Sequence, residues 1–416
     1  MTTPDKEPVR DADLVEQRNA AGIGFVLRLA RALHGYGLSA DALEAALHRM
    51  SERLGLEGQF FSTPTSVLAA FGPVERQRTH MIRVYPGDVD LGKLARLDAV
   101  SRDVEHGRLT VLEGSARIDL IIASPPTSSP LLRVVGYGVA SAAVCRILAG
   151  GQNEVMVAGL AGLITGMLSL ASRRLLHGTH VFELVAALAV SALVTAIAST
   201  GLRISIPTAT LGGVIVLLPG LTVTLAMNEL ARRHLAAGTA RLTGAFLVFV
   251  AIALGVAVGS EIAGAIVGDV RSFTPRRLPP LTLTMALGIA PLAFAAILRA
   301  RLRDVPWLWL TSTIGYTAVR TAALLFDTAL AALVGSLVVG VLANLYDRWG
   351  YGPATVLLVP GVLLLVPGSI GYRSLASLLD QNVLVGVTAG FTMILTAVAL
   401  AGGLLVASVI VPPRRG

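Results

Sequence analysis

Long uninterrupted runs of apolar residues fill the chain after residue 130 and constrain its fold more than any other feature. About 20 helical residues cross a hydrocarbon core of ~30 Å, so apolar runs of roughly 18 or more residues predict transmembrane helices. The chain is therefore expected to be an α-helical polytopic membrane protein. Ten spans are predicted, near residues 131–150, 154–172, 181–200, 208–227, 242–261, 282–299, 305–323, 328–345, 352–372 and 384–411.

The charged residues divide the chain into two unlike parts. Residues 1–125 hold 17 of the 26 acidic and 15 of the 34 basic residues, which is typical of a soluble segment. Helical periodicity in this segment, together with three short runs that read as strands, QFFST, SVLAAFG and THMIRVY, predicts a small α+β domain. Thr110-x-x-Glu113 predicts a capping box at the start of its last helix. The expected organisation is a disordered tail (1–20), a soluble α+β cytoplasmic domain (21–122), a Pro-rich linker (123–130), a first five-helix repeat (131–262), a connecting loop (263–281) and a second five-helix repeat (282–412).

Two of the predicted spans contain nearly the same eight residues. Gly213–Gly220 reads GVIVLLPG, and 148 positions later Gly361–Gly368 reads GVLLLVPG. They fall in the fourth and ninth spans, so the membrane part reads as five helices repeated. Because five is odd, a directly joined second copy enters from the opposite side of the membrane, which gives the inverted repeat found in many secondary transporters.

A Pro-Gly pair inside a membrane helix interrupts its hydrogen bonding. Proline lacks the backbone N–H and clashes with the carbonyl four residues earlier, while glycine accepts unusual dihedral angles. The freed polar groups must be satisfied by protein, water or a ligand. The matched pair therefore predicts a site at the repeat interface, although single kinks of this kind are often structural. The candidate substrate-binding residues are Pro219, Gly220, Thr224, Asn228, Pro367, Gly368 and Ser369.

Carboxylates near the spans are candidates for coupling transport to protons. A buried carboxylate is costly unless it is partnered, so one that faces the bundle interior can titrate. Glu229, which closes the fourth span, and Glu183, which opens the third, are the two candidates, and Arg232 and Arg233 offer Glu229 a local ion pair. The alternative is that these carboxylates are solvated at the membrane interface.

Several function classes are disfavoured by the sequence. The single cysteine, Cys145, excludes a disulfide framework or a thiolate metal site, and no phosphate-binding G-x-x-x-x-G-K-[ST] loop occurs. The basic surplus lies in short loops, where it indicates orientation rather than nucleic-acid binding. Eleven loop arginines on one side against six on the other place both termini and the soluble domain in the cytoplasm of a cell-membrane protein.

Four motifs in order resemble the threonine/serine exporter family. They are LARALHGYGLSADALEAALHRMSERLGL, DLGKLARLDAV, LLPG followed by NELARRHLAAGTARL, and LLLVPGSIGYRSL. The resemblance covers roughly residues 20–410. It implies a ten-helix secondary exporter of L-threonine and L-serine driven by the proton motive force, in a family whose split relatives are linked to dicarboxylate export.

The leading hypothesis is therefore a proton-coupled exporter of small hydroxy amino acids. A homo-oligomer is compatible with this hypothesis, and neither a cofactor nor enzymatic activity is expected. A dicarboxylate (succinate-like) exporter and a pore gated by the soluble domain are the alternatives. A membrane-anchored hydrolase is disfavoured because residues 1–125 contain no recognisable nucleophile–base pair.

Overall fold

A computed structural model describes residues 7–84, 87–175, 181–268 and 270–413. The chain divides into two compact units, unit 1 up to Pro126 and unit 2 from Thr127 onward. Each unit is described by itself.

Unit 1 combines helices with a three-stranded antiparallel sheet of order β1-β2-β3. The three predicted strands are present, and Phe61, Leu68 and Met81 lie directly opposite one another across them. Its elements are α1 (Glu7–Gly35), α2 (Ala40–Arg53), β1 (Gly58–Thr63), β2 (Ser66–Phe71), η1 (Val74–Arg76), β3 (Arg78–Arg83), α3 (Leu91–Glu105) and α4 (Val111–Ala123).

The N-terminal segment differs from the expected tail. Helix α1 begins at Glu7, so residues 7–20 form its first turns, while residues 1–6 lie outside the described residues. The segment is rich in Glu, Ala, Arg, Leu and Gln, which are strong helix formers, and it continues directly into the amphipathic part of the helix.

The predicted capping box at the start of α4 is present. The Thr110 side chain accepts from the Glu113 amide, and Glu113 accepts in return from the Thr110 amide at 2.8 Å. This backbone hydrogen bond lowers the pKa of Glu113 from its ordinary value of 4.5. The cap fixes the beginning of the last helix before the linker.

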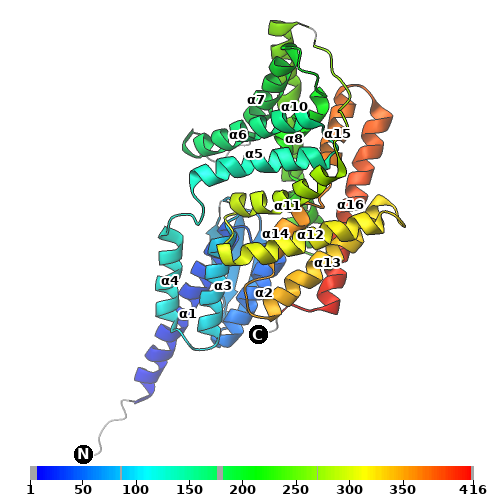
Figure 1. The fold of residues 1–416 in the computed structure, drawn as a ribbon. Helices are drawn as coiled ribbons and strands as arrows, with labels where there is room; N and C mark the ends of the chain where they lie inside the picture. Colours follow the sequence, from blue (N-terminus) through cyan, green and yellow to red (C-terminus); the bar gives the residue numbers. More distant parts are fainter. Residues whose placement is uncertain (1–6, 85–86, 176–180, 269, 414–416) are drawn as a thin grey trace, which may run out of the picture. The chain divides into compact units, whose positions relative to one another are not determined.

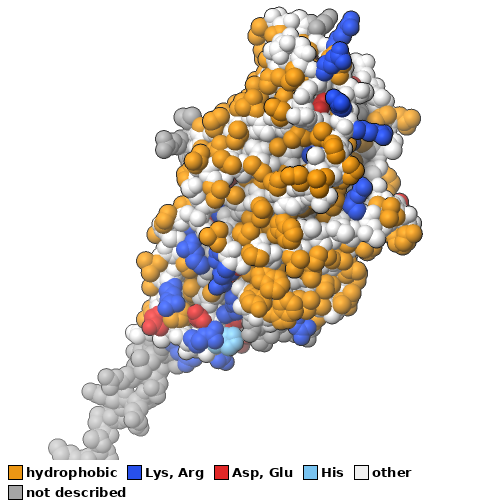
Figure 2. Space-filling model, in the orientation of Figure 1, with side chains coloured by type: hydrophobic (Ala, Val, Ile, Leu, Met, Phe, Trp, Pro, Cys, Tyr) orange, Lys and Arg blue, Asp and Glu red, His pale blue; other side chains and the backbone are white. Residues whose placement is uncertain are grey.

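Unit 2 is built almost entirely of helices (Figure 1). Hydrophobic side chains cover most of its visible face, as expected for a surface in contact with lipid (Figure 2). The elements are α5 (Pro130–Ile147), α6 (Gln152–Leu175), α7 (Val181–Ser199), α8 (Ile206–Val214), η2 (Ile215–Leu217), α9 (Gly220–Ala231), α10 (Leu235–Val267), α11 (Pro280–Ile297), η3 (Leu302–Asp304), α12 (Val305–Ala322), α13 (Thr328–Arg348), α14 (Thr355–Leu363), α15 (Gly368–Leu379) and α16 (Val383–Ile410).

The described residues contain eight helical spans that are long and apolar enough to cross a membrane, one of which joins α14 and α15 (Thr355–Leu379), or nine if the bent pair α8–α9 is one span. The chain is thus a multi-pass helical protein. Helix α12 occupies the seventh predicted span, 305–323, but is not among the eight or nine. Its Thr and Ser residues and Arg320 reduce its apolar character, and the count of ten stays a prediction.

Both Pro-Gly sequences interrupt their helices. Between α8 and α9 the axis bends by 53°, and α9 starts at Gly220 directly after Pro219. In the second half, α14 ends at Leu363 and α15 starts at Gly368 directly after Pro367. The predicted breaks therefore exist in both spans and begin a new helix at the same residue of the motif.

Other backbone features recur at the same spacing. The described chain has four non-glycine residues with positive φ, and they form two pairs: Ala149 and Arg299, 150 positions apart, and Arg233 and Gln381, 148 apart. Each member follows the end of a helix. Left-handed residues outside glycine are uncommon, so their recurrence at corresponding helix ends is a strong internal similarity.

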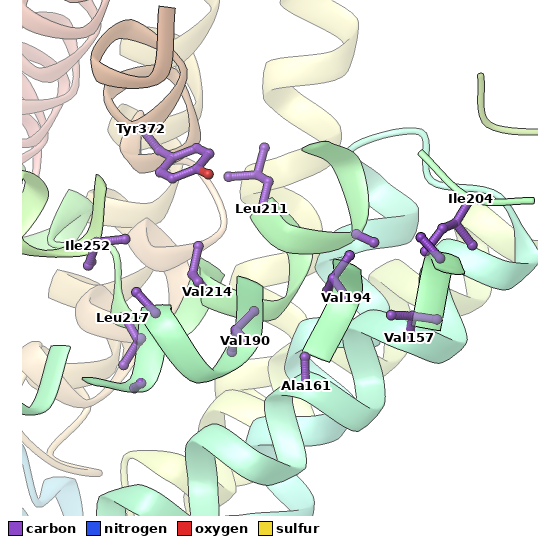
Figure 3. Close-up of a cluster of buried hydrophobic side chains, with 14 residues drawn as sticks. Val157, Ala161, Val190, Val194, Ile204, Leu211, Val214, Leu217, Ile252 and Tyr372 are labelled. Atoms are coloured by element: carbon purple, nitrogen blue, oxygen red, sulfur yellow. The ribbon is translucent and has the colours of Figure 1, made fainter. Parts of the chain in front are cut away.

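Residues of α15, in the second half, pack into the core of the first half. Tyr372 of α15 is 7% exposed and belongs to the same buried cluster as Leu211, Val214 and Ile252 (Figure 3). In the opposite direction, Leu221 of α9 packs against the second-half cluster of Val339, Val362 and Leu404. The helices that follow the two breaks therefore each pack into the other half.

Glycine lets α7 and α10 pack backbone to backbone. A Cβ atom on Gly255 or Gly259 of α10 would overlap the carbonyl oxygen of Leu184 or Leu188 in α7. This small-x-x-x-small spacing is typical of membrane helices that approach closely. Gly255-x-x-x-Gly259 is thus a packing motif between α7 and α10.

We predict that Gly259→Ala lowers the thermal unfolding temperature in detergent, because the added methyl group clashes with Leu188 and such overpacking costs about 1–3 kcal/mol. Gly264→Ala on the same helix is the control, since no atom lies within 4 Å of its Cβ position. It should leave the unfolding temperature unchanged or raise it. Equal behaviour of the two variants would contradict the close helix contact.

Candidate functional site at the crossing of two broken helices

The two helix breaks contact each other through their backbones. A Cβ atom on Gly220 would lie 2.9 Å from the Gly368 amide nitrogen and 3.0 Å from Gly368 Cα. The neighbouring side chains make reciprocal contacts: Val366 lies 2.9 Å from the Gly220 Cβ position, and Leu218 lies 3.3 Å from that of Gly368. Leu218 and Val366 are themselves 148 positions apart. Tertiary structure therefore brings Pro219, Gly220, Pro367 and Gly368 together.

Two helix N-termini meet at this crossing. Helices α9 and α15 start at Gly220 and Gly368, and neither Pro219 nor Pro367 caps its helix with a side chain. The N–H groups of Gly220 and Gly368 find no acceptor among the residues that the structure describes. Unpaired N–H groups and the positive end of the helix dipole favour an anion, so the crossing can bind a carboxylate.

The two candidate residues with a hydroxyl group, Thr224 and Ser369, lie within about one turn of the crossing. Thr224 is fully buried, and its hydroxyl donates to the Gly220 carbonyl at 3.1 Å. Ser369 is half-buried at the second position of α15. The Thr224 hydroxyl is engaged by the helix itself, which leaves Ser369 as the candidate side chain with a hydroxyl at the start of a broken helix.

Asn228 and Glu229 lie at the other end of α9, about 12 Å along the helix axis from Gly220. Glu229 is fully buried and forms a forked ion pair with Arg241 of α10, in which both nitrogen–oxygen distances are 3.0 Å. The expected ion pair was with Arg232 or Arg233. Arg232 donates to Asn228 Oδ1 at 3.4 Å and to the Ser408 hydroxyl of α16 at 3.3 Å, and the local pairing stays a prediction.

Glu183 lies in the first turn of α7, where it is half-buried. The structure does not group it with the residues of the crossing. Both proton-coupling assignments, to Glu229 and to Glu183, stay predictions.

The structure adds residues that sequence reasoning missed. Glu154, at the start of α6, is 2% exposed and accepts from the Ser205 amide at 2.7 Å, which ties α6 to the beginning of α8. Asp304 occupies the corresponding position before α12, 150 residues later, and is also buried. The sequence shows that the two carboxylates are 150 positions apart, each near the start of a helix, but it does not show that they are buried. No group of three metal-binding side chains occurs within the described ranges.

Comparison with protein families decides the classification. A model of the threonine/serine exporter family matches residues 24–263, which is more than half of the chain. The chain belongs to the threonine/serine exporter family. A second model, described as Threonine/Serine exporter, ThrE, matches residues 284–410. The two models divide the chain between α10 and α11, where the repeat was expected to divide it.

Curated relatives include membrane proteins of fungi. The chain is 27% identical to pheromone-regulated membrane protein 10 of Saccharomyces cerevisiae, with 99% of this chain and 56% of the relative covered. It is also 27% identical to the Yarrowia lipolytica protein of the same name, with 92% and 32% covered. The chain thus spans about half the length, or less, of these relatives. No solved structure matches it.

We predict that Gly220→Ala abolishes transport by this exporter family member, because the methyl group has no space against Gly368 and Val366. Gly244→Ala in α10 is the matched control, since nothing lies within 4 Å of its Cβ position. Uptake into proteoliposomes is the measurement, after equal insertion of both variants is confirmed. Full activity of Gly220→Ala would show that the close approach is dispensable.

A second prediction concerns Glu229 and Arg241. Removing one partner of a buried ion pair costs about 3–5 kcal/mol because the other charge is left buried. Glu229→Gln and Arg241→Gln should each lower the unfolding temperature, and the double variant should lower it by less than the sum of the two. Strictly additive effects would mean that the pair does not hold α9 against α10.

Proposed function

We propose that this protein is a secondary exporter of L-threonine, L-serine and similar small amino acids, with the substrate bound at the crossing of α9 and α15. The observation that carries the proposal is the backbone contact between Gly220 and Gly368 at two matched helix breaks. Membership of the threonine/serine exporter family supports the substrate class.

The crossing suits a zwitterionic substrate. The N-terminal amide groups at Gly220 and Gly368 would attract the carboxylate. Pro219 and Pro367 have no N–H to donate to the carbonyls four residues earlier, those of Ile215 and Leu363. The Ile215 carbonyl accepts from the Leu218 amide at 3.3 Å instead, so the Leu363 carbonyl is the one proposed to bind an ammonium group. Discontinuous helices that offer N-terminal donors and unwound carbonyls are the usual substrate sites of secondary transporters.

An inverted repeat accounts for the internal similarity of unit 2. Leu218 contacts Gly368, and its equivalent in the other half, Val366, contacts Gly220, the equivalent of Gly368. Such reciprocal contacts are those expected around a two-fold axis. The paired left-handed residues at helix ends support the same symmetry. Rocking of the two five-helix repeats about the crossing would expose the substrate to each side in turn.

Proton coupling and orientation complete the proposal. The loop arginines favour both termini and unit 1 in the cytoplasm. Glu229 and Glu183 remain the candidate proton carriers, although the ion pair with Arg241 gives Glu229 a structural role as well. If Glu229 carries the proton, Glu229→Gln loses the pH dependence of export; if it only holds α10, Arg241→Gln shows the same defect.

A counterflow experiment in proteoliposomes tests the substrate class. Vesicles loaded with unlabelled L-threonine should transiently accumulate labelled L-threonine and L-serine above the external concentration. Vesicles loaded with succinate should not do so with labelled succinate. Accumulation of succinate alone would replace the amino acid proposal with the dicarboxylate alternative.

The same vesicles test the gated-pore alternative. A pore cannot concentrate solute, so an imposed proton gradient would give no accumulation of labelled threonine through it. A proton-coupled exporter should accumulate threonine in a manner that a protonophore abolishes. Equilibration without accumulation would reject secondary active transport.

A further inference from the structure

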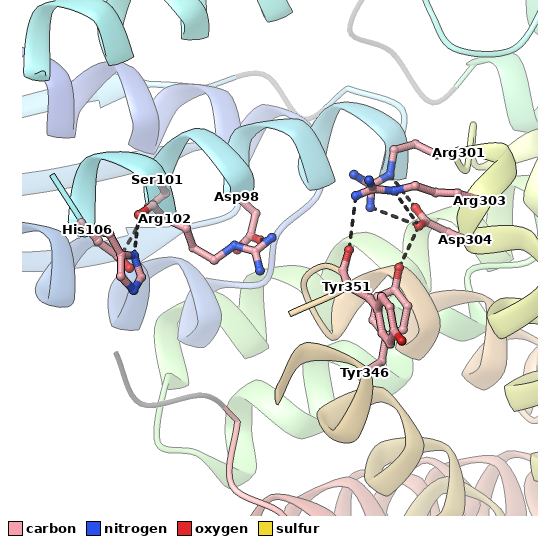
Figure 4. A network of polar contacts seen from close by, with 10 residues as sticks. Asp98, Ser101, Arg102, His106, Arg301, Arg303, Asp304, Tyr346 and Tyr351 are labelled. Atoms are coloured by element: carbon pink, nitrogen blue, oxygen red, sulfur yellow. Dashed lines mark hydrogen bonds and ion pairs between the residues drawn. The ribbon is translucent and has the colours of Figure 1, made fainter. Parts of the chain in front are cut away.

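Basic and aromatic side chains gather at one end of the second half of unit 2. They come from the turn between α11 and α12 and from the end of α13 with the turn after it (Figure 4). This group, named here the Arg–Trp cluster, consists of Arg301, Arg303, Asp304, Trp307, Tyr346, Arg348, Trp349 and Tyr351.

One buried carboxylate organises the cluster. Asp304 is 1% exposed and pairs with Arg301 through nitrogen–oxygen distances of 2.6 and 3.1 Å. It also accepts from the Tyr346 hydroxyl at 2.7 Å, and Arg303 lies 3.5 Å away. Arg303 in addition donates to the Tyr351 carbonyl at 3.3 Å. The α11–α12 turn is thereby fastened to the end of α13.

The cluster keeps a surplus of positive charge after these contacts. Arg303 shares its carboxylate with Arg301 and leaves 65% of its side chain exposed. Arg348 is exposed and has no hydrogen bond or ion pair with any residue in the described part of the chain. Even when Asp347 is counted with Asp304, three guanidinium groups face two carboxylates.

Aromatic residues give this charge a membrane-interface setting. The ring of Trp307 lies 5.4 Å from that of Tyr351 and 6.0 Å from that of Trp349. Trp349 is 58% and Tyr351 49% exposed, and Leu302 in the α11–α12 turn is 89% exposed. Trp and Tyr with one apolar and one polar end are typical of the headgroup level of a bilayer.

The basic residues are of the type that binds phosphate. From residue 127 onward the chain contains no lysine, so every basic side chain of unit 2 except histidine is arginine. The planar guanidinium fork matches two oxygens of a phosphate group, and basic groups between membrane helices are known to hold anionic headgroups.

We propose that the Arg–Trp cluster is a binding site for the headgroup of an anionic membrane phospholipid. Arg303 and Arg348 contact the phosphate, while Trp349 and Leu302 pack against the glycerol and the first part of the acyl chains. Arg301 stays paired with Asp304 and positions the turn. This site is separate in sequence from the α9–α15 crossing and does not depend on the transported substrate.

Tryptophan fluorescence reports on this site directly, because all three tryptophans of the chain, Trp307, Trp309 and Trp349, lie in the cluster or within one turn of it. The protein is reconstituted into nanodiscs with brominated phosphatidylglycerol or brominated phosphatidylcholine, which carry the same phosphate but differ in net charge. Brominated lipid quenches only from within the bilayer, so the signal does not report soluble phosphate. Half-maximal quenching should need less brominated phosphatidylglycerol than brominated phosphatidylcholine, by about fivefold for each arginine that contacts the headgroup.

Matched variants complete the test. Arg348→Gln, which breaks no described contact, and Arg303→Gln should each reduce the preference for phosphatidylglycerol about fivefold. Arg277→Gln, an exposed arginine in the loop before α11, should leave the preference unchanged. Equal quenching by the two lipids in the unsubstituted protein would overturn the proposal, as would a preference that survives in both Arg303→Gln and Arg348→Gln.

Discussion

The absence of water in the bilayer core makes an interrupted helix costly, and unit 2 contains two such interruptions at matched positions. Each proline removes an amide donor, and each following glycine starts a new helix whose first N–H groups have no partner within the helix. The structure places Gly220 against Gly368 so closely that a Cβ atom on Gly220 would lie 2.9 Å from the Gly368 amide nitrogen. The unpaired polar groups of both helices are thus collected at one place, where a ligand can satisfy them.

The packing around this crossing links the two halves. Tyr372 of α15 inserts into the first-half core and Leu221 of α9 packs on the second-half core. The two halves also pack against each other through α5 and α11, where a Cβ atom on Gly136 would lie 3.2 Å from the Ile297 side chain. Elsewhere the helices are held by glycine contacts such as those between α7 and α10 and by buried ion pairs such as Glu229–Arg241, which resist deformation. Helix breaks at the interface of two repeats, between packed helix pairs, are the arrangement found in many secondary transporters.

Charge is used differently at the centre and at the ends of the unit. The crossing offers backbone dipoles and the Ser369 hydroxyl, which in the proposed site would hold a substrate charge without the desolvation cost of a buried ionised side chain. Ionised side chains near the helix ends are paired, as in Arg301 with Asp304, or exposed, as in Arg348. This distribution separates the proposed site for a small zwitterion from the surface proposed to bind an anionic headgroup.

The sequence by itself determined the helical membrane class, the three strands of unit 1, the capping box at Thr110 and both helix breaks, because each depends on local chemistry: apolar length, alternation, a side-chain cap and proline. Its motifs also indicated membership of the threonine/serine exporter family. Only the tertiary structure decided that Gly220 touches Gly368, that Glu229 pairs with Arg241 of α10, and that Glu154 and Asp304 are buried. Those facts depend on how helices distant in sequence pack and on where a chain turns after a helix, and neither is encoded in the periodicity of a single segment.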